Sequence, residues 1–367
     1  MSVTDPIHPD DRLAEILLSH EIRWRDRAHF LEGRGYLLRP RLRPGWQPSW
    51  LGTNKLWVEV EDGIGTPLRD HLIDATRLSD GKMVYIKRVQ SGDLESSIAI
   101  RFSSEPLRSD PRNHSVPILD TFVDSDDSQI SYIVMPFLKP IHRPEIDYIG
   151  ELLDFGEQIL EGLTFLHENG VAHRDCASTN IMMDASAMYP QGFHPIEQDY
   201  LPDHSGGAPS YSRITAGVKY YFVDYGISSE FPVDSDPATR LVVGRLGRDQ
   251  EPPELSDTVP YDPFKLDIFL IGNIFRRKYY EVAVNLGFLR PFVLAMTNPD
   301  PNARPQAHEL LTQWRLTRRK FSAANRHWRI KLRDEPVAEQ LFWDGINLVR
   351  LAVHFVKWLG GSRFPGA

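Results

Sequence analysis

The sequence predicts an α+β protein in which a small, largely antiparallel, strand-rich region precedes a larger and mainly helical one. Two observations predict this order. Strand-like patterns bounded by turn residues dominate residues 56–138. From Ile149 onward the apolar residues recur at helical spacing instead. The 367 residues are sufficient for two lobes with extensions.

Composition and charge narrow the class of protein. The chain is 41% hydrophobic and 25% charged, which is ordinary for a globular protein. Its net charge of -8 leads us to expect no nucleic-acid partner. The first residues are polar and acidic, without an apolar signal core, and no apolar run is long enough to predict a membrane span. Because Cys176 is the single cysteine, no internal disulfide can form, and we expect an intracellular protein, cytoplasmic or nuclear.

Residues 1–55 are predicted to be an N-terminal extension. A helix is expected over residues 10–33, because apolar residues recur there near helical spacing. Residues 35–50 are rich in Arg, Pro, Trp and Gly and are expected to lie extended against the body. We interpret the aromatic side chains of that segment as its attachment and Arg39 and Arg41 as solvated.

The small lobe is predicted to comprise residues 56–138. Its expected strands are residues 56–60, 71–75, 83–87, 118–123 and 130–135. The turn residues Ser79-Asp80-Gly81-Lys82 predict a hairpin between the second and third of these strands. One helix is expected over residues 94–102.

The large lobe is predicted to comprise residues 139–325. It opens with an amphipathic helix from Ile149 to about Gly170. Further helices are expected around residues 264–279, 289–296 and 306–320, and a short apolar strand at 220–223.

Two segments of the second half are less regular. Residues 185–218, rich in Pro, Gly, Ser and His, are predicted to be an insertion that is either functional or partly disordered. We interpret its His194 and His204 as solvated side chains rather than metal ligands. Residues 326–367 are expected to form a helical tail. Its amphipathic stretch 341–359 is expected to pack on the large lobe, with weak membrane-surface contact as the alternative.

The strongest chemical signal is the sequence His173-Arg174-Asp175, with Asn180 five residues after the aspartate. These four residues match the catalytic-loop pattern of protein kinases. In that chemistry the aspartate orients the attacking hydroxyl, and the asparagine holds a magnesium ion near the phosphates. A short turn can direct both side chains at one point.

A second signal is Asp224-Tyr225-Gly226, which follows an apolar strand. The strand delivers Asp224 to its end, and Gly226 permits the turn that follows. Asp224 would bind the Mg²⁺ that bridges the phosphates of ATP.

A third signal is Lys87 at the end of Met83-Val84-Tyr85-Ile86-Lys87, which is similar to Val-Ala-Ile-Lys. Such a lysine pairs with the ATP phosphates and with a helix glutamate. We favour Glu95 as that glutamate over Glu105, because Pro106 disfavours a helix at Glu105.

Three further motifs have no catalytic role but occur in the matching order. Pro252-Pro253-Glu254 resembles Ala-Pro-Glu, and residues 267–272 resemble the Asp-x-Trp-Ser-x-Gly start of a helix. Arg304 stands where protein kinases carry an arginine that pairs with the glutamate. We therefore expect a structural ion pair between Glu254 and Arg304.

On these residues the chain resembles a eukaryotic protein kinase over about residues 56–320. The sequence Arg-Gly-Tyr-x-Leu-Arg-Pro-Arg at residues 34–41 and the long insertion make it similar to the protein-kinase-like proteins of basidiomycete fungi. The resemblance implies a bilobal protein-kinase-like fold with ATP in the cleft. It also implies a hinge after Met135, with Phe137 flanking the adenine.

The function that the resemblance implies is ATP- and Mg²⁺-dependent transfer of the γ-phosphoryl group to a protein hydroxyl, with Ser or Thr favoured over Tyr as acceptor. It implies catalytic roles for Asp175 and Lys87, and an activation segment from Asp224 to Glu254 in which Arg174 would pair with a phosphate. The substrate is not named by any of these motifs.

The sequence departs from the kinase pattern at two places. The candidate phosphate loop, residues 63–68, lacks a third glycine, and its Pro67 removes a backbone donor. Ala177 stands where many Ser/Thr kinases carry a lysine. Two alternatives therefore stay open: a pseudokinase that acts as a binding or scaffold module, and a small-molecule kinase of the aminoglycoside or choline type.

Overall fold

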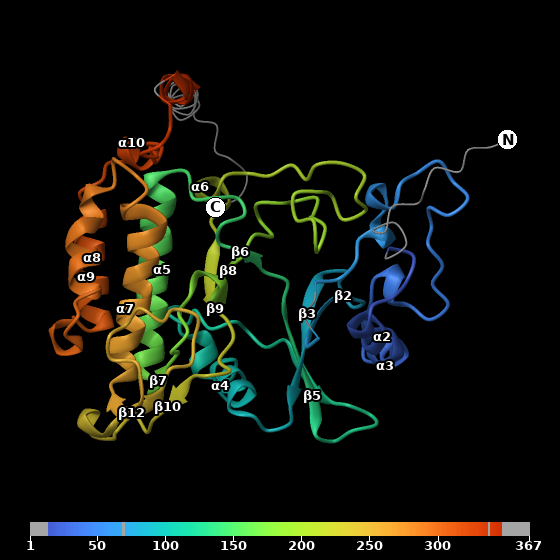
Figure 1. Ribbon diagram of the computed structural model, residues 1–367, viewed down its shortest axis with the longest axis horizontal. Helices are drawn as coiled ribbons and strands as arrows, with labels where there is room; N and C mark the ends of the chain where they lie inside the picture. The colour runs from blue at the N-terminus through green and yellow to red at the C-terminus, as the bar shows by residue number, and fades with distance from the viewer. Residues whose placement is uncertain (1–13, 68–69, 337, 347–367) are drawn as a thin grey trace. The chain divides into compact units, whose positions relative to one another are not determined.

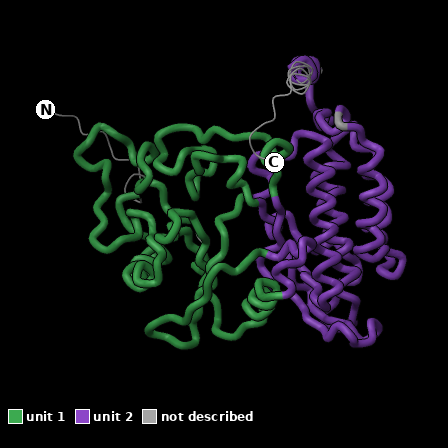
Figure 2. Tube along the Cα trace, turned by 180° about the vertical axis from the view of Figure 1, so that it is seen from behind, with its two compact units in different colours: residues 1–105, 116–139, 184–218 green, residues 106–115, 140–183, 219–367 purple. Residues whose placement is uncertain are grey.

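The computed structural model describes residues 14–67, 70–336 and 338–346 (Figure 1). The chain divides into two compact units (Figure 2). Unit 1 comprises residues 1–105, 116–139 and 184–218, and unit 2 comprises residues 106–115, 140–183 and 219–367. Helices and antiparallel sheet are both present, as the α+β class predicts.

Unit 1 is built on a five-stranded sheet whose neighbouring strands are all antiparallel, in the order β1-β2-β3-β5-β4. Its strands are β1 (Tyr36–Leu37), β2 (Leu72–Arg77), β3 (Met83–Gln90), β4 (Asp120–Val123) and β5 (Ile130–Pro136). The predicted hairpin joins β2 to β3, and Gly81 takes the left-handed conformation there, with φ 69°. The Arg77 amide closes the turn with a hydrogen bond of 2.8 Å to the Lys82 carbonyl.

One face of this sheet carries the core of unit 1. Val84 and Ile86 alternate inward along β3 and pack with Trp24 and Leu31, which come from α2 (Ser19–Asp26) and α3 (Ala28–Gly33). One further helix of unit 1, α4 (Leu94–Phe102), has the bounds expected from the sequence. It begins at Asp93, whose carboxylate accepts a hydrogen bond from an amide in the first turn.

The N-terminal part of unit 1 differs from the prediction at two places. Where one helix was expected over residues 10–33, α2 and α3 are separate short helices, and residues 1–13 lie outside the described ranges. The expected strand 56–60 is wrong, since Trp57–Glu59 is a 3₁₀ turn. The Glu59 carboxylate accepts the Leu56 amide at 2.7 Å, and this local bond favours a turn over strand pairing.

The arginines of residues 35–50 are not all solvated, so that interpretation is wrong for two of them. The Arg41 side chain is 2% exposed, and its Nε lies 2.8 Å from the fully buried carboxylate of Glu21. The Arg39 Nε lies 3.0 Å from the buried carboxylate of Asp74 in β2. Because buried guanidinium groups need partners, these two ion pairs fix the segment against helix α2 and strand β2.

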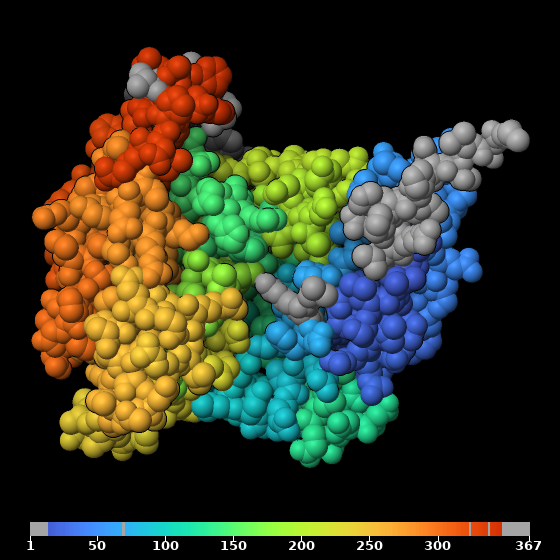
Figure 3. Space-filling view, in the orientation of Figure 1, coloured from blue at the N-terminus to red at the C-terminus, as the bar shows by residue number. Residues whose placement is uncertain are grey.

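The insertion belongs to unit 1 and has its own buried contacts. The fully buried Lys139 ammonium donates to the Tyr189 hydroxyl at 2.8 Å and to the Gln198 carbonyl at 2.7 Å. The side chains of His194 and His204 are 0% and 6% exposed, so their interpretation as solvated side chains is wrong. A short helix, α6 (Arg213–Ala216), ends the insertion. Figure 3 shows the insertion, coloured yellow-green, as a continuous part of the visible surface.

Unit 2 is mainly helical. Its helices are α5 (Ile149–Glu168), α7 (Pro263–Phe275), α8 (Arg290–Met296), α9 (Ala307–Arg318) and α10 (Ala323–Arg326), with a π-helical turn at Arg276–Tyr280. The helices α5 and α9 lie side by side (Figure 1). The Trp314 indole donates to the Leu153 carbonyl at 2.9 Å and covers Gly156, where a Cβ would lie 2.0 Å from the ring.

Short strands position the loops of unit 2. Strand β7 (Val171–Ala172) pairs antiparallel with β10 (Ser229–Glu230). Strand β11 (Val242–Gly244) pairs antiparallel with β12 (Ser256–Tyr261). Strand β8 (Ile181–Asp184) is the hydrogen-bonded neighbour of β9 (Lys219–Phe222). A two-residue strand, β6 (Lys139–Pro140), lies at the boundary of the two units in the sequence. The predicted strand at 220–223 therefore corresponds to β9.

The tail is described only in part. Residues 338–346 are helical, and Leu341, Phe342 and Trp343 are exposed. Most of the amphipathic stretch 341–359 lies outside the described residues, so its packing and its membrane contact stay predictions. Within the described ranges, no helix is long and apolar enough to cross a membrane.

Candidate functional site

The loop that contains His173, Arg174 and Asp175 follows β7 in unit 2. It is fixed by Asp267 of α7, whose side chain is 0% exposed. The two carboxylate oxygens of Asp267 accept the His173 amide at 2.8 Å and the Arg174 amide at 2.7 Å. Arg174 takes the left-handed conformation, with φ 67°, which is costly for a residue with a Cβ. A buried carboxylate therefore holds this loop in a strained conformation.

Asp175 and Asn180 contact each other. The Asn180 Nδ2 donates to the Asp175 carbonyl at 3.0 Å and to its Oδ2 at 2.8 Å. The other carboxylate oxygen of Asp175 accepts the backbone amide of Arg248 at 2.9 Å. Both oxygens are thus oriented, while the Asp175 side chain remains 13% exposed. A carboxylate held in this way can still accept a hydrogen bond from a hydroxyl.

The loop that contains Asp224 joins the same group. The Val223 amide donates to the Asn180 carbonyl at 3.0 Å, and the Val223 carbonyl lies 3.1 Å from the His173 Nε2. Asp224 itself has φ 68°, a second left-handed residue with a Cβ. Tyr225 is buried, with its ring centroid 5.2 Å from that of His173. Backbone bonds therefore bring the loops of Asp175, Asn180 and Asp224 together within unit 2.

Asn180 and Asp224 are the residues of this group that could hold a magnesium ion. Because both donors of the Asn180 amide are directed at Asp175, its oxygen is the atom left for a cation. Asp224 is half-buried and supplies a carboxylate. Mg²⁺ prefers oxygen ligands and usually takes only one or two from the protein, the rest coming from water and phosphates. Two protein oxygens are therefore sufficient for such a site.

The other predicted residues lie in unit 1. The Lys87 Nζ is 2.5 Å from the Glu95 Oε1, and each side chain is 12% exposed. Glu95 is thus the glutamate that contacts Lys87, whereas Glu105 lies beyond the end of α4. Met135 is paired with Tyr85 across β3 and β5.

The Phe137 side chain is packed inside unit 1. Its ring stacks on Tyr85 with a centroid distance of 4.4 Å, and it lies 5.6 Å from the ring of Phe193 in the insertion. Phe137 is 9% exposed. Most of its ring is therefore used in packing, and its predicted place beside the adenine stays a prediction.

The candidate phosphate loop is occupied by contacts of its own. The Gly63 amide donates to the Val60 carbonyl at 3.2 Å, and the Thr66 amide donates to the Glu21 carboxylate at 3.1 Å. Gly63 also packs so closely on Trp57 that a Cβ would lie 1.9 Å from its carbonyl oxygen. Amides used in this way are not available to phosphates. The sequence predicted a phosphate loop with few backbone donors here. It did not predict that the Glu21 carboxylate would bind one of the remaining amides.

The segment between residues 224 and 254 is tied to the rest of unit 2 at two places. The Arg174 guanidinium lies 3.2 Å from the Ser229 hydroxyl and 3.2 Å from the Val243 carbonyl. The expected ion pair between Glu254 and Arg304 is present and bidentate, at 2.5 and 2.9 Å. The Arg304 side chain is fully buried, so this pair anchors the end of the segment.

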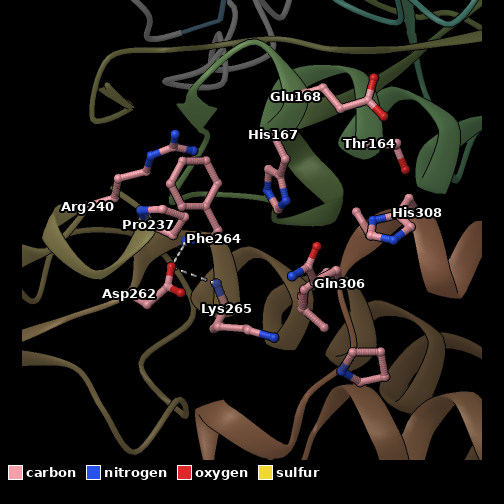
Figure 4. A pocket seen from close by; sticks show the side chains of 13 residues that line it. Thr164, His167, Glu168, Pro237, Arg240, Asp262, Phe264, Lys265, Gln306 and His308 are labelled. Atoms are coloured by element: carbon pink, nitrogen blue, oxygen red, sulfur yellow. Dashed lines mark hydrogen bonds between the residues drawn. The ribbon is translucent and has the colours of Figure 1, made fainter. Parts of the chain in front are cut away.

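Two of the hollows in unit 2 differ in how they lie relative to the predicted site. One, of about 240 Å³, is lined by residues that include His167, Arg240 and His308, and none of the predicted site residues borders it (Figure 4). The other, of about 250 Å³, borders the catalytic loop at Cys176 and Ala177. Burial raises the pKa of the Cys176 thiol well above its usual value, so this thiol is neutral.

Comparison with known proteins gives a partial match to a curated relative. No protein-family model matches the chain. The chain is 27% identical over 158 residues to cyclin-dependent kinase 12 of Caenorhabditis elegans, which covers 39% of this chain and 22% of the length of that relative. This match supports a relationship to the protein-kinase-like superfamily and a kinase-like function. It supports no particular family within that superfamily.

Proposed function

We propose that the chain is an ATP- and Mg²⁺-dependent protein kinase with a bilobal protein-kinase-like fold. The observation that carries the proposal is the Asp175 carboxylate, which is oriented by the Asn180 amide at 2.8 Å and by a backbone amide at 2.9 Å. Backbone bonds link this pair to the loop of Asp224. The similarity to basidiomycete protein-kinase-like proteins remains a finer expectation within this proposal.

Each residue has a defined role in the proposed reaction. Lys87, held by Glu95, positions the phosphates of ATP, and Asp175 accepts a hydrogen bond from the substrate hydroxyl and orients it for in-line attack. Asn180 and Asp224 would hold Mg²⁺, which neutralises charge on the phosphates when bound. Serine or threonine is the proposed acceptor, in a protein substrate. Most of the rate enhancement would come from positioning and electrostatic stabilisation.

One observation favours a second function, that of a pseudokinase scaffold. The Thr66 amide in the candidate phosphate loop is hydrogen-bonded to the buried Glu21, so the loop offers fewer donors to ATP. A small-molecule kinase is a weaker alternative. The Glu254–Arg304 pair closes a segment of the kind that protein kinases carry. For this reason we rank the small-molecule kinase behind the protein kinase and the pseudokinase.

The proposal is tested by phosphoryl transfer from radiolabelled ATP to casein and histone, and to aminoglycosides and choline, in the presence of Mg²⁺. The test compares wild type with Asp175→Asn and with Asp334→Asn, a matched control at an exposed position of unit 2 outside the predicted activation segment. We expect protein labelling that Asp175→Asn lowers by about 10²- to 10⁴-fold and that the control leaves unchanged. Labelling of a small molecule alone, or ATP binding without transfer, would contradict the proposed reaction.

A further inference from the structure

A hollow of about 250 Å³ lies beside the candidate catalytic loop, within unit 2. Its lining combines two kinds of residue. The buried ones include Cys176, Leu270 and Ile274. The exposed ones include three cations, which are Arg248, Arg277 and Lys278. The hollow therefore has an apolar interior and a cationic exposed border.

The acidic side chains near this hollow are already neutralised. Asp249 accepts the Asn273 amide at 2.7 Å and lies 3.2 Å from the Arg277 guanidinium. Glu251 pairs with Arg276 at 2.5 Å and contacts Arg277 closely. Arg277 thus joins the π-helical turn to the segment that contains Asp249 and Glu251. Arg277 is thus not a free cation for a ligand.

The charges of Arg248 and Lys278 are not neutralised by close ion pairs in the described part of the chain. The Arg248 side chain is 60% exposed, and its Nε is 3.8 Å from the Asp175 Oδ2, which is a loose contact. In the described part of the chain, the Lys278 Nζ has neither a hydrogen bond nor an ion pair. Two cations thus border an apolar hollow next to Asp175. Among the described residues, Asp175 is the one carboxylate within 4.0 Å of the Arg248 guanidinium.

We propose that this hollow binds an acidic side chain, aspartate or glutamate, of the protein substrate, close to the residue that receives the phosphoryl group. The inference rests on the proposed function. An acidic residue fits because its methylene stem can lie on the apolar lining while its carboxylate pairs with Lys278 and Arg248. The shared contact between Arg248 and Asp175 places this subsite beside the hydroxyl that would react.

A binding measurement tests the inference without depending on turnover. Fluorescein-labelled peptides of about ten residues carry one serine, flanked by glutamates in one peptide and by lysines in its partner. Their affinity for the full chain is measured by fluorescence anisotropy at fixed ionic strength. Wild type is compared with Lys278→Glu and with Lys320→Glu, which makes the same charge change at an exposed residue after α9. Circular dichroism melting confirms that each variant is folded.

We expect the glutamate peptide to bind more tightly than the lysine peptide. Lys278→Glu should weaken the binding of the glutamate peptide by up to about fivefold, the largest factor that an exposed ion pair contributes, and Lys320→Glu should leave it unchanged. Equal binding of the two peptides, or equal loss in both variants, would overturn the inference.

Phosphoryl transfer to the same peptides separates this inference from the proposed function. Lys278-dependent binding without any transfer would support the subsite and contradict the kinase activity. Transfer to both peptides at the same kcat/KM would support the kinase activity and contradict the subsite. A higher kcat/KM for the glutamate peptide, lost in Lys278→Glu, would support both.

Discussion

The buried carboxylate of Glu21 accepts the Thr66 backbone amide at 3.1 Å and the Arg41 guanidinium at 2.8 Å. Burial raises the pKa of Glu21, but hydrogen bonds from Arg41 and from the Leu18 and Thr66 amides lower it more, so the pKa lies below its usual value. The carboxylate is therefore charged at neutral pH. It ties residues 63–67, the candidate phosphate loop, to helix α2.

Replacing Glu21 should destabilise the protein strongly. Glu21→Gln would leave the Arg41 guanidinium, which is 2% exposed, without its charged partner. We expect the free energy of unfolding to fall by about 3–5 kcal/mol, as it does when one member of a buried ion pair is removed. Urea unfolding followed by circular dichroism measures the change. The control is Glu32→Gln at an exposed position, and equal midpoints for both variants would contradict the expectation.

His194 should make stability depend on pH. Burial lowers the pKa of His194 to about 3, helped by the charges of Arg39 and His204. The geometry agrees, because its Nδ1 accepts the amides of Ile196 and Glu197 at 3.2 and 3.0 Å and cannot also carry a proton.

The sign follows from the two states of His194. The unfolded chain binds the proton near pH 6.5, and the folded one does so only near the lowered pKa. The free energy of unfolding should therefore fall as pH decreases from 6.5 toward 3, by up to about 1.4 kcal/mol per pH unit. His194→Asn should remove this part of the slope. Parallel stability curves for the two proteins would contradict the burial of a neutral imidazole.

The Glu254–Arg304 pair should be structural rather than catalytic. Both side chains are buried, at 7% and 0% exposure, so Arg304→Ala leaves an unpaired buried carboxylate. We expect a loss of about 3–5 kcal/mol in unfolding free energy. Arg319→Ala, at an exposed position after α9, should change it by less than about 0.5 kcal/mol. Thermal and urea unfolding of both variants provide the comparison.

Lys87 and Glu95 should act as one unit in phosphoryl transfer. The ammonium and the carboxylate are 2.5 Å apart, so either substitution disturbs both groups. We expect Lys87→Met to lower kcat by about 10²-fold, the usual effect of removing one electrostatic contact to a reacting group. Adding Glu95→Gln should lower it little further, because the residues are coupled. Multiplicative losses in this double-mutant cycle would show that the pair has no joint role.

Local patterns predicted much of the fold and part of the site. The hairpin at Gly81, helix α4 after Asp93 and helix α5 follow from turn chemistry, capping and apolar periodicity, all of which act within a few residues. The contact between Asp175 and Asn180 is equally local, since five residues separate them. Such features are visible in a sequence because their causes are adjacent in it.

Contacts between distant residues that belong to no recognised motif were not predictable in the same way. The alternating pattern at residues 56–60 resembles a strand, but the Glu59 carboxylate selects a turn. The burial of Arg41 depends on Glu21, which lies 20 residues before it. The Arg248 amide reaches Asp175 from 73 residues away. No local pattern encodes these pairs, because each side chain is ordinary until the fold supplies its partner.

Magnesium-dependent phosphoryl transfer to protein is the most direct test of the account. Wild type and Asp224→Asn are compared for ATP binding by calorimetry and for labelling of protein serine and threonine from radiolabelled ATP, with Mg²⁺ and with a chelator. We predict that wild type binds and transfers with Mg²⁺, and that Asp224→Asn and the chelator each abolish transfer. Wild type that neither binds nor turns over ATP with Mg²⁺ would contradict the kinase account and leave the scaffold.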